Sequence, residues 1–115
     1  MVELFKALAE ESRLRILSLI VENDMCVCNI EICLNMTQSN ASRHLTVLKQ
    51  NGILQSYKQA QWTYYRISDS FINENNELFL YLRTKLKELP TYQKDQIELE
   101  RCKGLHICTH NTTPH

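Results

Sequence analysis

The segment from Thr37 to Gly52 constrains the fold of this chain more than any other. Thr37 is suited to cap the start of a helix, because its hydroxyl accepts a hydrogen bond from an amide two or three residues later. Gly52 is suited to end that helix in a left-handed conformation. Between them, Ala41, Leu45 and Leu48 recur at the spacing of one helix face. The sequence therefore predicts an amphipathic helix with a defined beginning and end.

The opposite face of this predicted helix is small, polar and cationic. Short hydroxyl and amide side chains let a helix backbone approach the floor of the major groove, and a guanidinium reaches guanine edges or phosphates. An ordinary solvated helix face would be richer in Glu and Lys pairs. The candidate DNA contacts on this helix are Gln38, Ser39, Asn40, Ser42, Arg43, Thr46 and Lys49.

Charge is segregated along the chain. Residues 32–68 contain four basic residues and no acid, whereas the remaining segments hold all thirteen acids and nine bases, for a net charge of zero. Such an uneven distribution is a local electrostatic footprint for a polyanion. The alternative interpretation is a polar surface that happens to lack acids.

Two β-prone runs follow the helix, at residues 53–58 and 62–67, separated by Gln59, Ala60 and Gln61. This pattern predicts a hairpin, and a hairpin after a helix-turn-helix is a wing. Lys58 at its tip and Arg66 on its return strand are predicted to contact phosphates, which raises affinity without specifying sequence. The aromatic residues of the hairpin are expected to pack within the protein.

The other predicted helices occupy residues 2–8, 12–21, 28–34, 69–89 and 91 onward, and only two glycines and two prolines interrupt the chain. The expected fold is mainly α with a β-hairpin: a winged helix-turn-helix with five to six helices and a two-stranded wing. Residues 1–105 should form one DNA-binding and dimerisation domain and residues 106–115 a flexible tail. The terminal helices offer a dimer surface, and a symmetric dimer would bind an imperfect palindrome of double-stranded DNA.

Composition limits where the protein can be located and how it can use its cysteines. No apolar run reaches membrane-spanning length, so the expected location is the cytoplasm, without a membrane partner. Five unevenly spaced cysteines are more typical of metal ligands, redox groups or buried small residues than of a disulfide framework.

Four motifs in this order resemble the ArsR/SmtB family of winged-helix metalloregulators: residues 4–17, the Cys26-Val27-Cys28 pair, residues 38–45 and residues 61–66. The resemblance extends over about residues 2–105. It implies a homodimeric repressor that binds operator DNA when metal-free and releases it when an inducer occupies its cysteines. The cysteine pair resembles the site of branches that respond to arsenite, antimonite, cadmium or lead. Zinc-responsive branches use Asp and His after the wing, and residues 69–89 contain no histidine.

The third sulfur decides the inducer, because As(III) is satisfied by three sulfurs whereas Cd(II) usually takes a fourth ligand. The resembling arsenical branch typically places a third cysteine where this chain has Glu31. Cys33 lies seven residues after Cys26 and returns to nearly the same face of a continuous helix, so it is a candidate, as is a buried structural role for it. Cys102 and Cys108 are further candidates.

The sequence thus predicts a repressor, with no obligatory cofactor, that As(III) or Sb(III) releases from DNA through Cys26, Cys28 and Cys33. Two alternatives remain open: a repressor responding to Cd(II) or Pb(II), and one responding to thiol oxidation. An enzyme is not expected, since no acid lies near His44 in the sequence to orient it as a base. His44 is expected to pack or to hydrogen-bond within the protein.

Overall fold

The computed structural model describes residues 1–105, so the expectations of a flexible tail at residues 106–115 and of a ligand at Cys108 lie outside the described residues. Within residues 1–105 there are seven α-helices, one 3-10 helix and a three-stranded antiparallel sheet. The elements are α1 (Val2–Leu8), α2 (Glu11–Ile20), β1 (Met25–Cys26), α3 (Val27–Leu34), α4 (Gln38–Gln50), β2 (Leu54–Gln59), β3 (Trp62–Ile67), α5 (Asp69–Glu74), α6 (Asn76–Lys85), η1 (Leu86–Glu88) and α7 (Tyr92–Leu105). The winged helix-turn-helix prediction is confirmed, with more helices than the five to six expected.

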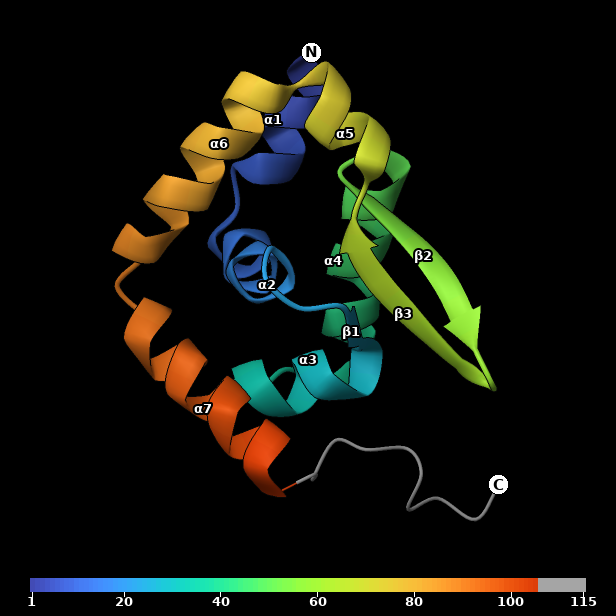
Figure 1. Ribbon diagram of the computed structural model, residues 1–115, viewed down its shortest axis with the longest axis vertical. Coiled ribbons are helices and arrows are strands. Elements are labelled where there is room, and N and C mark those ends of the chain that lie inside the picture. The colour runs from blue at the N-terminus through green and yellow to red at the C-terminus, as the bar shows by residue number, and fades with distance from the viewer. Residues whose placement is uncertain (106–115) are drawn as a thin grey trace.

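Helix α2 runs through the centre of the molecule and is seen nearly end-on in Figure 1. Residues 16–20 are all buried, which requires neighbours on every side of the helix. Those neighbours include α1, α4, α7 and β3. In the part of the chain that the structure describes, no helix is both long and apolar enough to cross a membrane.

Helices α3 and α4 form the helix-turn-helix, and α4 begins where the sequence predicts. The turn between them passes through Asn35 in the left-handed conformation, with φ of 55°. The Thr37 hydroxyl then caps α4 by accepting a hydrogen bond from the Asn40 amide at 3.2 Å. The predicted core stripe is fully buried, since Ala41, Leu45 and Leu48 have no exposed surface.

The end of α4 also follows the prediction. Gly52 adopts φ of 76°, which a residue with a Cβ atom avoids. The Gly52 amide donates to the Lys49 carbonyl and the Ile53 amide donates to the Leu48 carbonyl, each at 3.0 Å. These two bonds are the Schellman motif, and buried Ile53 completes it with an apolar contact.

Strands β2 and β3 form the predicted hairpin, with a shorter turn than expected. Gln59 belongs to β2 and pairs with Trp62, so only Ala60 and Gln61 make the turn. Ala60 has φ of 59°, a left-handed conformation that the sequence did not signal because the residue is not glycine or asparagine. Tyr57 and Tyr64 stack across the hairpin with ring centroids 5.7 Å apart.

A third strand, β1, joins the hairpin on the outer side of β3 and was not predicted. The sheet order is β1-β3-β2, and Met25 pairs with Tyr65 while Cys26 pairs with Tyr64. Two residues are too few to show an alternating pattern in the sequence. This strand connects the backbone before α3 directly to the wing.

The prediction of one long helix at residues 69–89 is wrong, because the chain breaks at Asn75 into α5 and α6. Asn75 has φ of −130° and ψ of 45°, outside the helical region. Its amide donates to the Phe71 carbonyl and its carbonyl accepts from the Phe79 amide, each at 2.8 Å, so it ends one helix and starts the next. Asparagine favours such local breaks. Figure 1 shows α5 and α6 meeting at an angle beside α1. Phe71 of α5 and Phe79 of α6 are both buried.

Helix α7 packs against α2 and α3 of its own chain, so only its outer side is available to the predicted dimer surface. The Arg15 guanidinium donates to both carboxylate oxygens of Asp95, at 2.8 and 3.0 Å, and Asp95 is fully buried. This pairing raises the pKa of Arg15. Leu99 and Cys102, on the same side of α7, are also buried. The ion pair and the apolar residues together fix α7 on the body of the protein.

Candidate nucleic-acid interface and cysteine sites

The outward face of α4 is accessible as predicted. Six of the seven candidate DNA contacts on this helix are exposed, and Ser42 is half-buried. Helix α4 carries no acidic residue, so no carboxylate on the helix opposes a phosphate backbone. The arrangement is that of a recognition helix whose apolar stripe is anchored and whose polar side is available to a duplex.

The wing supplies the two other candidate cations. Lys58 is exposed near the end of β2, and Arg66 is exposed near the base of β3. An Arg66 guanidinium nitrogen lies 3.8 Å from an Asp69 carboxylate oxygen, on the exposed surface. A phosphate approaching Arg66 therefore competes with a nearby acid, whereas no acid neighbours Lys58 on its own strand.

His44 supports the recognition helix from behind. It is only 3% exposed, and its Nε2 atom lies 3.2 Å from a Glu10 carboxylate oxygen. The Arg13 guanidinium lies 3.2 Å from Nδ1 and the Arg43 guanidinium lies 3.5 Å from Nε2, so two arginines and Glu10 surround the ring. The sequence expectation that no acid lies near His44 is wrong, since Glu10 comes from the segment between α1 and α2.

Burial lowers the pKa of His44, with Glu10 opposing this and Arg43 and Arg13 adding to it. The imidazole is therefore neutral at pH 7 and acts as a hydrogen-bonded support for α4, in line with the packing role expected. Glu10 and Arg13 were missed as part of this network, because only the fold brings α2 and α4 together.

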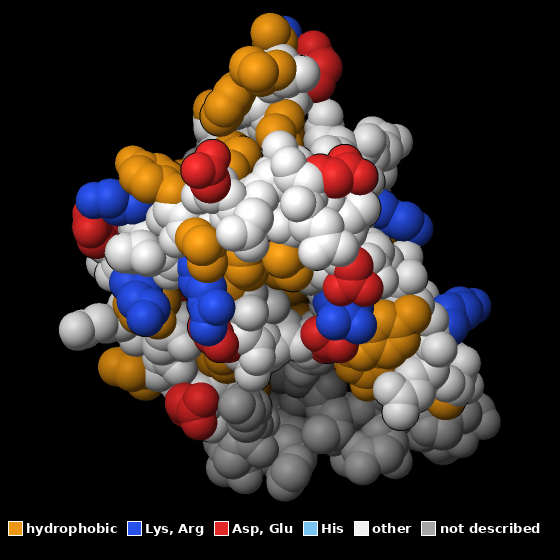
Figure 2. Space-filling view, turned by 45° about the horizontal axis from the view of Figure 1, so that its top comes forward, with side chains coloured by type: hydrophobic (Ala, Val, Ile, Leu, Met, Phe, Trp, Pro, Cys, Tyr) orange, Lys and Arg blue, Asp and Glu red, His pale blue; other side chains and the backbone are white. Residues whose placement is uncertain are grey.

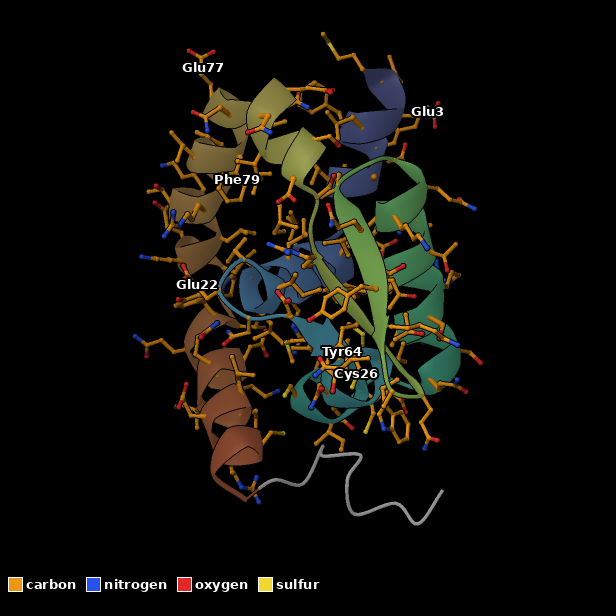
Figure 3. All side chains as sticks on the ribbon, turned by 45° about the vertical axis from the view of Figure 1, so that its right-hand side comes forward. Glu3, Glu22, Cys26, Tyr64, Glu77 and Phe79 are labelled. Atoms are coloured by element: carbon orange, nitrogen blue, oxygen red, sulfur yellow. The ribbon has the colours of Figure 1, made fainter. Side chains whose placement is uncertain are left out.

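Cys26 sits at a junction of three elements. It ends β1, caps α3 and pairs through its backbone with Tyr64 of the wing, and Figure 3 shows Cys26 and Tyr64 side by side. The Asn29 amide oxygen accepts from the Cys26 thiol at 2.8 Å and from the Cys26 amide at 3.4 Å. This thiol is thus part of the cap that holds the first turn of α3.

Cys26 and Cys28 both line one cleft, of about 440 Å³. The cleft reaches from the start of α3 to the first residue of α4 and to the start of β3. Its lining residues are Cys26, Val27, Cys28, Glu31, Gln38, Trp62 and Thr63. A ligand held by these sulfurs would touch the recognition helix and the wing as well.

The two thiols of the cleft are neutral at pH 7. Burial raises the pKa of Cys26 above its ordinary value of 9.0, and hydrogen bonds from Asn29 and from the local backbone only partly offset this. Burial also raises the pKa of Cys28, with smaller effects of the same sign from Cys26, Glu31 and Cys102. Glu31 also lines this cleft, at the position where the arsenical site that this chain resembles has its third sulfur.

Cys33 does not join this cleft but lies against Cys102. The two Sγ atoms are 3.3 Å apart, across the contact between α3 and α7. Cys26 has extended backbone angles, so the seven-residue spacing to Cys33 does not follow a continuous helix. Within residues 1–105, no three His, Cys, Asp or Glu side chains are arranged to hold a metal ion as they stand.

An apolar groove runs along the other end of the molecule. Its lining residues are Phe5, Leu8, Ala9, Leu14, Leu78, Tyr81, Leu82, Lys85, Leu86 and Leu89, from α1, α2, α6 and the segment after α6. Met1 and Val2 at the start of the chain and Phe5 of α1 are exposed at this end, and Figure 2 shows hydrophobic side chains gathered at the top of the molecule. An exposed apolar surface of this kind is typical of an interface.

The family model of the bacterial regulatory protein, arsR family, matches residues 10–56, which contain the helix-turn-helix and Cys26, Cys28 and Cys33. The arsenical resistance operon repressor of Escherichia coli K12 is 43% identical over 68 residues, covering 58% of each chain. The chain thus matches little more than half the length of that relative.

A helix-turn-helix transcriptional regulator of Methanocaldococcus jannaschii is 42% identical over 73 residues, which cover 63% of this chain and 82% of the relative. Among solved structures, a homodimeric winged helix-turn-helix DNA-binding domain from Mycobacterium bovis, described as a possible ArsR-family transcriptional regulator, superposes with a TM-score of 0.62. It is 27% identical and covers 73% of this chain and 78% of that chain.

Proposed function

Since the chain belongs to the ArsR family of bacterial regulatory proteins, which are transcriptional regulators and not enzymes, we propose that it represses transcription by binding operator DNA in the cytoplasm. As(III) or Sb(III) releases it by binding Cys26 and Cys28, with Cys33 as the third sulfur. One observation carries the proposal: the cleft that holds both thiols is also lined by Gln38 of the recognition helix and by Trp62 of the wing.

Repression requires two copies of the chain on one operator. The apolar groove between α1 and α6 supports a symmetric dimer, and the homodimeric relative from Mycobacterium bovis has a similar fold. Two recognition helices about 34 Å apart would enter successive major grooves of an imperfect palindrome. Exposed Arg43 and Lys49 on α4, with Lys58 on the wing, would supply the phosphate or base contacts.

Inducer binding must rearrange the start of α3. An As(III) centre that takes the Cys26 sulfur displaces the Asn29 amide oxygen, now 2.8 Å away, and so removes the cap of the helix. Cys33 then reaches the same centre only if the first turn of α3 unwinds, because it now faces α7. The soft thiol set fits a thiophilic ion, and its incomplete assembly couples binding to movement.

That movement is transmitted in two directions. Helix α3 packs on α4, and Cys26 is backbone-paired with Tyr64 of the wing, so unwinding displaces both DNA-contacting elements. In free energy, the inducer must favour the DNA-free dimer by about 3 to 5.5 kcal/mol to clear an operator.

The test is fluorescence anisotropy of labelled DNA from upstream of the gene for this chain, titrated with reduced protein and then with arsenite, antimonite or cadmium. We expect release by arsenite and antimonite at stoichiometric concentrations. The Cys26→Ser/Cys28→Ser variant should bind DNA normally and resist release. Loss of DNA binding by that variant, or release by cadmium alone, would contradict the proposal.

DNA contact by α4 is tested separately with a matched pair of variants. Arg43→Ala should weaken operator binding by about 1 to 3 kcal/mol. Lys94→Ala removes an exposed cation from α7, away from α4 and the wing, and should leave operator affinity unchanged. Equal losses in both variants would show that only net charge matters.

A further inference from the structure

Cys33 and Cys102 form a second pair of thiols, separate from the cleft. Their Sγ atoms lie 3.3 Å apart although 69 positions separate the residues in the chain. Both side chains belong to the apolar core and are at most 5% exposed. Neither lines the cleft at the start of α3. The DNA-reading surface does not use them either.

We propose that a peroxide joins Cys33 and Cys102 in a disulfide, and that the oxidised repressor stays on its operator when arsenite is present. The second part rests on the proposed function, because it assigns Cys33 to the inducer. The first part does not depend on that assignment.

The chemistry requires only hydrogen peroxide as co-reactant. One thiol attacks the peroxide, the O–O bond breaks, and a sulfenic acid and one water form. The other thiol then attacks the sulfenic sulfur, the S–S bond forms, and a second water leaves with the remaining proton. Two thiols are oxidised by two electrons in total, and one peroxide is reduced to two waters.

The packing of α7 holds the two sulfurs ready for this reaction. Asp95, Leu99 and Cys102 recur at the spacing of one helix face, and all three are buried against the body of the protein. The bidentate contact between Arg15 and Asp95 fixes the orientation of α7. Cys102 lies near the C-terminal end of α7, and local opening of a helix, which costs less free energy than global unfolding, would admit a small neutral oxidant.

Oxidation removes a donor from the inducer and leaves the DNA-reading surface unchanged. A Cys33 sulfur bonded to Cys102 cannot ligate As(III), so only Cys26 and Cys28 remain in the cleft. The covalent bond also ties α3 to α7 in the arrangement that supports α4. The unwinding needed for release is therefore prevented by the same bond.

The disulfide is tested by mass spectrometry on the full chain with Cys33 and Cys102 as its only cysteines, the Cys26→Ser/Cys28→Ser/Cys108→Ser variant. After peroxide treatment, we expect a chain that carries no disulfide to a second chain, is 2 Da lighter than the reduced chain and resists alkylation after denaturation. We also expect the thermal midpoint of the oxidised variant to rise by about 10 °C. Adding Cys33→Ser should abolish both changes. Intermolecular products, or two alkylatable thiols after peroxide treatment, would overturn the proposal.

The effect on induction is tested by anisotropy with wild type and Cys102→Ser. Oxidised wild type should keep DNA affinity, resist arsenite, and be released after dithiothreitol. Cys102→Ser should be released by arsenite before and after peroxide. If oxidised Cys102→Ser also resists, oxidation at Cys26 and Cys28 is responsible and the inference fails. If reduced wild type is not released, the proposed function and this induction effect both fail, while the mass result still decides the disulfide.

Discussion

The two thiol pairs differ in their surroundings although each has one member in α3, Cys28 in the first pair and Cys33 in the second. Cys26 and Cys28 line a cleft beside the recognition helix and the wing, and Cys28 is partly exposed. Cys33 and Cys102 lie in the apolar core, against a helix fixed by a buried ion pair. The first pair lies beside the recognition helix and the wing, which we propose contact DNA, and the second pair lies where α3 packs on α7.

This difference shows that the surroundings of a cysteine determine which reaction its thiol favours. Cys28 is half-buried in the cleft and Cys26 is only 2% exposed, so an ion that replaces their protons must move the start of α3 and the elements beside it. A thiol in contact with another thiol in the core gains most from a neutral covalent bond, which buries no charge. Four changes test the contrast between the pairs, beginning with the largest expected effect.

Asp95→Asn should release α7 and so affect only the buried pair. It leaves the Arg15 guanidinium without its charged partner, and we expect the free energy of unfolding to fall by about 3 kcal/mol. Alkylation of Cys102 should become faster, with the alkylation rate of Cys28 in the cleft unchanged. The measurements are urea denaturation and thiol labelling. Glu98→Gln removes an exposed ion pair with Arg101 and should cost under about 0.5 kcal/mol; an equal cost would refute the anchoring role of Asp95.

The pH dependence of ligand binding should report on the cleft pair. Because the pKa values of Cys26 and Cys28 are raised above 9.0, both thiols remain protonated from pH 6 to 8, and Cd(II) must displace two protons. Cadmium affinity should therefore rise about 100-fold, or about 2.7 kcal/mol, per pH unit. Arsenous acid brings hydroxyl groups that leave as water, so its affinity should be nearly constant. Competition titrations at three pH values check this, and parallel slopes would contradict it.

Glu31→Cys should complete three sulfurs within the cleft. It replaces a carboxylate that lines the cleft with the donor that the arsenical resemblance expects there. Arsenite affinity should rise by about tenfold, or about 1.4 kcal/mol, and should no longer depend on Cys33. Glu31→Ser is the matched control, since it removes the charge without adding sulfur. Equal affinities for the two variants would argue that the third donor does not bind at this position.

Ala60→Gly should have the smallest effect, on the wing that borders the cleft. Ala60 holds φ of 59°, where glycine is unstrained, so the free energy of unfolding should rise by about 0.5 kcal/mol. Ala9→Gly, at a position with φ of −89°, should lower it instead. Thermal denaturation of both variants measures the difference. A lower midpoint for Ala60→Gly would show that the turn relaxes without strain.

Local signals predicted the parts of the fold that short segments determine. The side chain of Thr37 and the lack of one at Gly52 determine the start and end of α4, and two β-prone runs predict the hairpin. The break at Asn75 was missed because the apolar pattern continues on both sides of it. Strand β1 was missed because its partner, Tyr65, lies forty positions away in the chain.

The site was predictable by residue type and less so by arrangement. Cys26 and Cys28 are neighbours in any conformation, so their shared cleft follows from the sequence. The contact of Cys33 with Cys102 depends on the packing of α7 on α3, which no local pattern records. The Glu10 support of His44 depends in the same way on how α2 crosses α4.

The pairing of Met25 and Cys26 with the wing makes the hairpin part of the same unit of local opening as the cleft. Two residue pairs hold this edge of the sheet, so the strand separates at a lower free energy than the β2 and β3 ladder. When β1 opens, the amides of β3 and of the first turn of α3 become exposed to solvent together. In a hydrogen-exchange experiment, ligand binding at Cys26 and Cys28 would therefore change the exchange rates of the wing amides before those of the recognition helix.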